Sequence, residues 1–111
     1  MENNELNSLF DEGRVEKIER NGDEIQITLS QETSSYMIAN GFRIEDNDKA
    51  FLKIIFYQCD KYDEVKDEGE YGYVKKAYCL ENELRLVCEN LILSFSFISF
   101  KVKKIYTLAF R

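Results

Sequence analysis

The sequence predicts a mainly β protein in which an antiparallel sheet meander forms a curled sheet or a sandwich, with one or two short helices. The α+β class is the alternative. Several segments alternate apolar and polar residues, as strands with one buried face do. The pair Asn21-Gly22 is a strong turn signal, and the alternation in LILSFSFISF (residues 91–100) changes phase once. We expect a single domain, residues 1–111.

The composition is that of a folded chain, with 44% hydrophobic residues, 32% charged residues and no proline. No stretch approaches the roughly 18 apolar residues of a spanning helix, and the start MENNELNSLF does not resemble a secretory signal. We therefore expect a cytoplasmic protein. The three cysteines lack the spacing of metal ligands, which predicts reduced thiols packed as small hydrophobic side chains.

Two segments are candidate helices. Leu6, Leu9 and Phe10 have helical spacing, so residues 3–11 are expected to form a short amphipathic helix that ends near Gly13. Residues 31–40 fit either a helix, which we favour, or a second hairpin around Asn40-Gly41.

The segment between these candidates predicts a hairpin. Asn21-Gly22 suits the centre of a type I′ turn, because both central residues of that turn have positive φ. This turn places Ile18 opposite Ile25 and Arg20 opposite Asp23.

The middle of the chain combines an apolar run with an acidic run. Residues 50–59, AFLKIIFYQC, are apolar on both parities apart from Lys53, which predicts a central strand covered on both faces. Residues 60–73, DKYDEVKDEGEYGY, contain six acids, which predicts a solvated loop.

The last third predicts a strand meander. Strands are expected over residues 73–80 and 83–89, joined at Glu81-Asn82, with a further turn near Asn90. In the following segment the odd positions are apolar up to Phe97, and the even positions are apolar from Ile98 onward, interrupted only by Lys104. Because one inserted residue moves every later side chain to the opposite face, we expect a bend at Phe97-Ile98.

The chain lacks the residue patterns of common enzymes. It has no histidine, which excludes Ser-His and Cys-His nucleophilic pairs. No phosphate-binding glycine motif occurs, and the acidic segments do not fit the EF-hand pattern. We therefore expect a protein that is not an enzyme and that needs no metal or cofactor.

Charge is distributed unevenly along the chain. Residues 1–73 have 18 acids and 8 bases, a net charge of −10, and residues 74–111 have 3 acids and 7 bases, a net charge of +4. An acidic surface favours a basic protein partner. The acidic run supplies carboxylates and tyrosines for such a contact, although an exposed loop without a binding role remains the alternative. The candidate contact residues are Tyr62, Asp63, Glu64, Asp67, Glu68, Glu70 and Tyr71.

The order of these segments resembles that of small bacterial immunity proteins of polymorphic or contact-dependent growth-inhibition toxin systems. The resemblance is one of layout over most of the chain: the hairpin EGRVEKIERNGDEIQITL, the strand AFLKIIFYQC, an acidic connection and the ladder LILSFSFISFKVKKI. It implies a cytoplasmic protein that binds and neutralises a cognate toxin. Many such toxins are basic nucleases, whose nucleic acid an acidic inhibitor imitates.

Two alternatives remain open. The first is a structural or assembly subunit, phage-derived or homodimeric, that associates through an exposed edge strand such as the last one. The second is a single-stranded nucleic-acid-binding protein that uses basic residues such as Lys75, Lys76 and Lys101 beside tyrosines. The negative total charge disfavours the second alternative.

Overall fold

The computed structural model describes residues 4–11, 13–31 and 48–109, and it confirms a mainly β fold with a curled antiparallel sheet and one short helix. The described elements, in chain order, are α1 (Asn4–Phe10), β1 (Arg14–Asn21), β2 (Glu24–Gln31), β3 (Asp48–Tyr57), β4 (Asp60–Lys66), β5 (Gly72–Leu80), β6 (Glu83–Cys88), β7 (Leu91–Ser96) and β8 (Ser99–Ala109).

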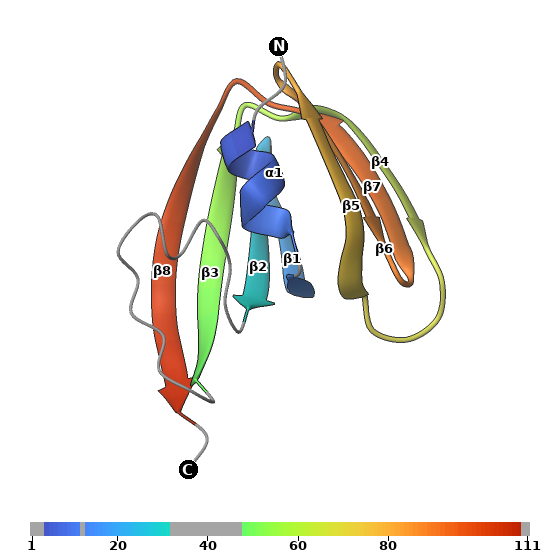
Figure 1. Ribbon diagram of the computed structural model, residues 1–111. Helices are drawn as coiled ribbons and strands as arrows, with labels where there is room; N and C mark the ends of the chain where they lie inside the picture. The colour runs from blue at the N-terminus through green and yellow to red at the C-terminus, as the bar shows by residue number, and fades with distance from the viewer. Residues whose placement is uncertain (1–3, 12, 32–47, 110–111) are drawn as a thin grey trace.

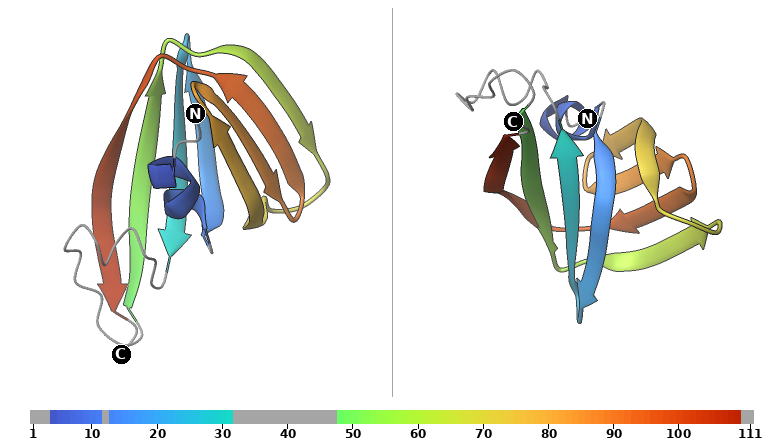
Figure 2. Two further views of the ribbon diagram at one scale, coloured as in Figure 1. Left: turned by 45° about the horizontal axis from the view of Figure 1, so that its top comes forward. Right: turned by 90° about the horizontal axis from the view of Figure 1, so that it is seen from below.

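The strands form one open sheet in the order β4-β7-β6-β5-β1-β2-β3-β8, so β4 and β8 are its edges. The sheet is folded into two halves that face each other at an angle (Figure 1). One half contains β1, β2, β3 and β8, and the other contains β5, β6, β7 and β4. The halves converge where β3 leads into β4 and β7 into β8 (Figure 2). β1 and β5 also join them, through a ladder that pairs Arg14 with Tyr73 and Val15 with Gly72.

The predicted bend at Phe97-Ile98 is confirmed. Phe97 is buried, whereas Ile98 is 63% exposed at the outside of the corner. Beyond it, Phe100 and Val102 pack against the core, so the inward parity has changed as the sequence indicates. The N–H of Ile98 donates to the Tyr57 carbonyl at 3.0 Å, which ties this corner to the neighbouring one between β3 and β4.

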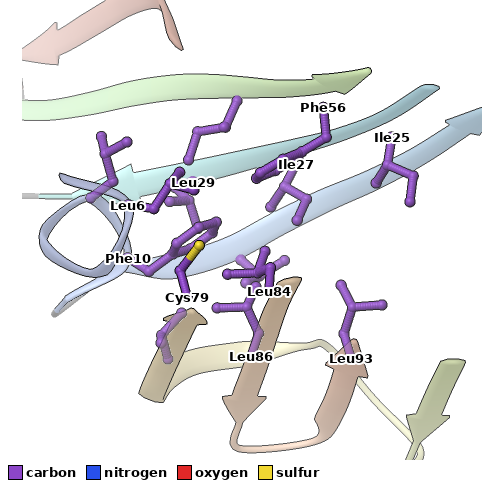
Figure 3. Close-up of a cluster of buried hydrophobic side chains, with 14 of the residues drawn as sticks. Leu6, Phe10, Ile25, Ile27, Leu29, Phe56, Cys79, Leu84, Leu86 and Leu93 are labelled. Carbon is purple, nitrogen blue, oxygen red and sulfur yellow. The ribbon is translucent and has the colours of Figure 1, made fainter. Parts of the chain in front are cut away.

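The core lies between the two halves, where inward side chains of both meet (Figure 3). Phe56 of β3 is fully buried near the corner, and its ring centroid lies 4.9 Å from that of Phe95 and 5.0 Å from that of Phe97, both in edge-to-face geometry. Edge-to-face rings bring the positive edge of one onto the negative face of the other. These contacts connect β3 of the first half with β7 of the second and with the corner.

α1 closes the space between the halves (Figure 1). The prediction of a helix over residues 3–11 is confirmed, and Leu6, Leu9 and Phe10 are all fully buried. The side-chain oxygen of Asn7 accepts a hydrogen bond of 2.9 Å from the backbone N–H of Cys79 in β5. The helix therefore both fills the core and satisfies a strand donor.

The β5–β6 hairpin has the predicted form. Its turn contains Glu81, whose φ is +56°, and Asn82. Leu84, Leu86 and Cys88 of β6 are buried on the inner face, as their alternation predicts. The three cysteines are unpaired thiols, in agreement with the prediction.

The β1–β2 hairpin exists, but its predicted register is wrong by two residues. Ile18 pairs with Ile27 and Asn21 with Glu24, so the two-residue loop is Gly22-Asp23 rather than Asn21-Gly22. Gly22 has φ of +63° at the first loop position, where a type II′ turn places glycine. The sequence permits both turns, and the observed one pairs Ile27 of the buried face with Ile18.

The prediction of a strand covered on both faces is half right. β3 is central, between β2 and β8, and Leu52, Ile54 and Phe56 are fully buried. Its other face, which carries Lys53 and Ile55, is only half-buried. Apolar residues on both parities therefore indicated a central strand correctly but not a second covering layer.

The prediction of a solvated loop over residues 60–73 is wrong. Residues 60–66 form β4, which pairs with β7, and only residues 67–71 connect it to β5. A charged segment can be an edge strand because one side of its backbone and most of its side chains face water. The helix or hairpin expected over residues 31–40 lies outside the described residues, apart from Gln31 at the end of β2.

Gly72→Ala is expected to destabilise the fold at the β1–β5 junction. A Cβ atom there would lie 2.7 Å from Oε1 and 2.9 Å from Cβ of Glu89, at a backbone φ of +84°. We expect the free energy of unfolding in urea to fall by about 2–3 kcal/mol. Gly22→Ala is the control, because Gly22 has φ of +63° with nothing within 4 Å, and it should cost about 1 kcal/mol. Equal losses would show that the contact with Glu89 contributes nothing.

Candidate functional site

β4 and the connection after it contain all seven candidate contact residues. β4 pairs with β7 on one side, with Glu64 opposite Leu93 and Val65 opposite Ile92, and its other side is the edge of the sheet. An irregularity in this ladder falls at Lys61, which has φ of +55°. β4 therefore presents carboxylates on an ordered strand, one side of which pairs with no described strand.

Tyr62 and Glu64 belong to the inner side of β4. The Tyr62 ring is stacked on Phe95 with centroids 6.3 Å apart, and the Arg20 guanidinium lies 3.7 Å from the Tyr62 ring centroid. Its hydroxyl donates to Oε1 of Glu64 at 3.0 Å. Burial raises the pKa of Tyr62 above its ordinary value, and the Glu64 carboxylate raises it further. The hydroxyl therefore stays protonated and keeps donating to Glu64.

The turn over residues 67–71 is held by Asn90. The Asn90 carbonyl accepts a 2.9 Å hydrogen bond from the Asp67 N–H, its backbone N–H donates to the Tyr71 carbonyl at 3.1 Å, and its side-chain amide donates to the Glu70 carbonyl at 2.8 Å. One residue thus bonds both ends of the turn. This arrangement fixes the backbone that carries Asp67 and Glu68, which lowers the entropic cost of ordering them in a complex.

Glu70 and Tyr71 already have partners within the protein. Glu70 forms an ion pair with Arg14 of β1. The Tyr71 ring packs against the core, and the Lys66 ammonium lies 4.9 Å from its centroid. These two residues help connect the turn to the rest of the fold, so the structure does not present them as unoccupied contact groups.

Three of the predicted contact residues remain available. Asp63, Asp67 and Glu68 are exposed, and their carboxylates make no hydrogen bond or ion pair with the described residues. We call these three residues the acidic edge. Asp63 projects from β4 itself, and the other two project from the turn that follows it.

Sequence reasoning missed the apolar residues beside the acidic edge. Val65 is 59% exposed and lies opposite Ile92 of β7, which is 41% exposed. Both are on the outer face, because Leu91 and Leu93 on either side of Ile92 are buried. The sequence contained one signal for this patch, because Val65 is the single aliphatic residue in a run of acids and lysines. An isolated valine does not predict an apolar patch when the segment is interpreted as a loop.

The outer face of the same half also contains a shallow hollow of about 350 Å³. Ser94 and Ser96 of β7 contribute to it, with Tyr78 and Leu80 of β5 beside them. Lys61, Glu83 and Arg85 complete its charged lining. The serines of LILSFSFISF therefore lie on a surface and not in the core.

Among the described residues there is neither a metal-binding cluster nor an activated thiol. These residues contain no group of three or more metal-ligating side chains. Burial raises the pKa of the thiols of Cys59 and Cys79, and burial with the nearby Glu89 raises that of Cys88 to about 11, so all three favour the unreactive thiol form. None of the described helices is long and apolar enough to cross a membrane.

Comparisons with models of protein families, with curated proteins and with solved structures found no match for this chain.

Tyr62→Ala is expected to loosen β4 from the core. The substitution removes the stacking on Phe95 and the contact with Arg20, so the free energy of unfolding should fall by about 2 kcal/mol in urea denaturation. Tyr62→Phe keeps the ring and removes only the hydrogen bond to Glu64, and should cost less than about 1 kcal/mol. If both variants lost the same small amount, the ring would not be what holds this strand.

Proposed function

We propose that this protein is a non-enzymatic, cytoplasmic inhibitor that binds a basic protein partner through the acidic edge, in the manner of an immunity protein that neutralises its cognate toxin. The observation that carries the proposal is the presence of three carboxylates, Asp63, Asp67 and Glu68, that lie on ordered backbone and form no ion pair with the described residues. A charged surface that is not neutralised internally steers an oppositely charged partner and adds specificity to the complex.

Carboxylates on and near β1 differ from those of the acidic edge, because they have cationic partners within the protein. Glu19 lies 3.6 Å from the Lys17 ammonium and 3.9 Å from that of Lys53, and Glu70 is paired with Arg14. Their charges are compensated on the protein surface. Those of the acidic edge are left for a partner.

The apolar neighbours supply the other ingredient of an interface. Val65 and Ile92 form an exposed pair beside Asp63, and a small apolar centre with charged surroundings is the usual anatomy of a protein–protein contact. The resemblance in layout to immunity proteins adds the identity of the partner: a toxin with a basic cleft, such as a nuclease. An acidic inhibitor of such a toxin occupies the place of the nucleic acid.

The direct test uses the C-terminal domain of a protein encoded by the neighbouring open reading frame. If that domain arrests growth when expressed alone, its expression together with this protein should restore growth. Purified together, the two proteins should form a stable complex by calorimetry. A domain that arrests growth and neither binds this protein nor is inhibited by it contradicts the proposal for that pair.

Reversal of charge at the acidic edge is expected to slow association. Asp63→Lys with Asp67→Lys should reduce the association rate with the toxin domain by about 10-fold or more at low salt, with a smaller effect at high salt. The control is Asp11→Lys with Asp23→Lys, two exposed acids in turns outside β4 and the turn that follows it. Both double variants change the net charge from −6 to −2, since each replaces two acids by two lysines. Equal slowing in both would assign the effect to total charge and remove the acidic edge from the site.

A specific observation also supports the homo-oligomer as the second candidate function. β8 is the other edge of the sheet and, with 11 residues, the longest described strand. Edge strands of this length can pair with a second copy. Sedimentation at micromolar concentration separates the candidates: the inhibitor proposal predicts a monomer, and a stable dimer disrupted by proline substitution in β8 would favour assembly.

A further inference from the structure

The pairing of β4 with β7 determines which backbone groups of β4 face outward. The Asp67 N–H donates to the Asn90 carbonyl, and the same register continues through Val65–Ile92 and Asp63–Ser94. Hydrogen-bonded and non-hydrogen-bonded pairs alternate along an antiparallel ladder. Asp63 and Val65 therefore direct their N–H and C=O groups toward β7, and Glu64 and Lys66 direct theirs away from the sheet.

This outward side is accessible. Glu64 and Lys66 are exposed, and no other strand of the described sheet pairs with this side of β4. The side chains next to these outward backbone groups differ between the outer and the inner face of the sheet. Asp63 and Val65 lie on the outer face, and Glu64 lies on the inner side next to Tyr62.

We propose that β4 binds an extended segment of its protein partner as an additional antiparallel strand. Directly opposite residues in a sheet interact most strongly, and opposite charges across strands are favourable. The segment should therefore present basic residues opposite Asp63 and Glu64, and an apolar residue opposite Val65 that extends the patch with Ile92. This inference rests on the proposed function, since it describes how the partner engages the same edge.

A second copy of this chain does not fit the same position. An antiparallel β4–β4 pair centred on Glu64 would place the two Glu64 side chains opposite each other. One centred on Val65 would set Glu64 opposite Lys66 but Asp63 opposite Asp67. Each register therefore brings like charges together, which is destabilising. The charge pattern thus selects a basic segment over self-association.

The probe is a synthetic peptide of about eight residues, the length of an ordinary strand, with Thr-Val-Lys-Lys at its centre. In antiparallel order these four residues oppose Lys66, Val65, Glu64 and Asp63. A peptide with Thr-Val-Glu-Glu at its centre is the control. The lysine peptide should bind at least about tenfold more tightly by fluorescence anisotropy, and equal binding of the two peptides overturns the proposal.

Amide exchange in the unaltered protein tests the backbone pairing itself. Saturation with the lysine peptide should slow exchange of the Glu64 and Lys66 amides by about tenfold or more, because both gain hydrogen bonds. The Val65 amide, already bonded to β7, should change little. Unchanged exchange at Glu64 and Lys66 in the saturated complex overturns the proposal.

Two variants at Lys66 separate the backbone from the side chain. Lys66→Pro removes the side chain and the outward N–H, while leaving the β4–β7 bonds in place, because proline is tolerated at sheet edges. Lys66→Ala removes the side chain and keeps the N–H. The proline variant should bind the lysine peptide about fivefold to tenfold more weakly than the alanine variant. Equal affinities, with the Val65 amide still protected in both, overturn the proposal.

The outcomes distinguish the two proposals. If the toxin domain binds and depends on Asp63 and Asp67, but binding leaves the Glu64 and Lys66 amides unchanged, the inhibitor function stands and strand addition fails. If the lysine peptide pairs with β4 and no toxin domain is inhibited, strand addition stands and the assignment to a toxin system fails.

Discussion

β1 and β5 pair over only two residues, and beyond them the two halves of the sheet diverge (Figure 1). Water is therefore excluded from the inner faces of the sheet only if side chains fill the space between the halves. Two features meet this requirement. At the narrow end the rings of Phe56, Phe95 and Phe97 interlock across the corner. At the wide end α1 brings Leu6, Leu9 and Phe10 into the gap. The bend and the helix therefore depend on each other, because a flatter sheet would leave no space between its halves for the helix to fill.

The same bend creates the candidate site. β3 turns at the corner into β4, which becomes an edge strand of the opposite half instead of a further strand of the first. Tyr62 then reaches back under the edge to stack on Phe95, and Glu64 follows it through the hydrogen bond to the phenol. Inner side chains of β4 are in this way occupied by packing. Asp63 and Val65, which alternate with them, are left on the outside.

The sequence predicts a feature of this structure correctly where a local residue pattern is compatible with only one backbone conformation. It fails where the same pattern is compatible with two. The phase change at Phe97-Ile98 has one physical explanation, an inserted residue, and it located the corner correctly. Asn21-Gly22-Asp23 permits two turns that differ by two residues in register, and only the packing of Ile27 and its neighbours against the core distinguishes them. β4 carries charges on both faces because it is an edge, so its composition resembles that of a loop. The acidic character of the site was therefore predictable, whereas the separation of Asp63, Asp67 and Glu68 from the paired Glu64 and Glu70 depends on contacts with distant residues.

Charges on an edge strand have a simpler explanation, which is protection against edge-to-edge aggregation. Protection and binding both require that β4 does not pair with other copies of itself in the free protein. The two explanations differ in the structure that they require around the charged residues. Protection needs only charge, and a mobile turn or a lysine at each position would serve as well. Here the turn is held by three hydrogen bonds to Asn90, and an exposed Val65 lies among the charged residues of the strand. An ordered edge with an exposed apolar residue beside unpaired carboxylates is more than protection requires, and it is what recognition of a basic segment would use.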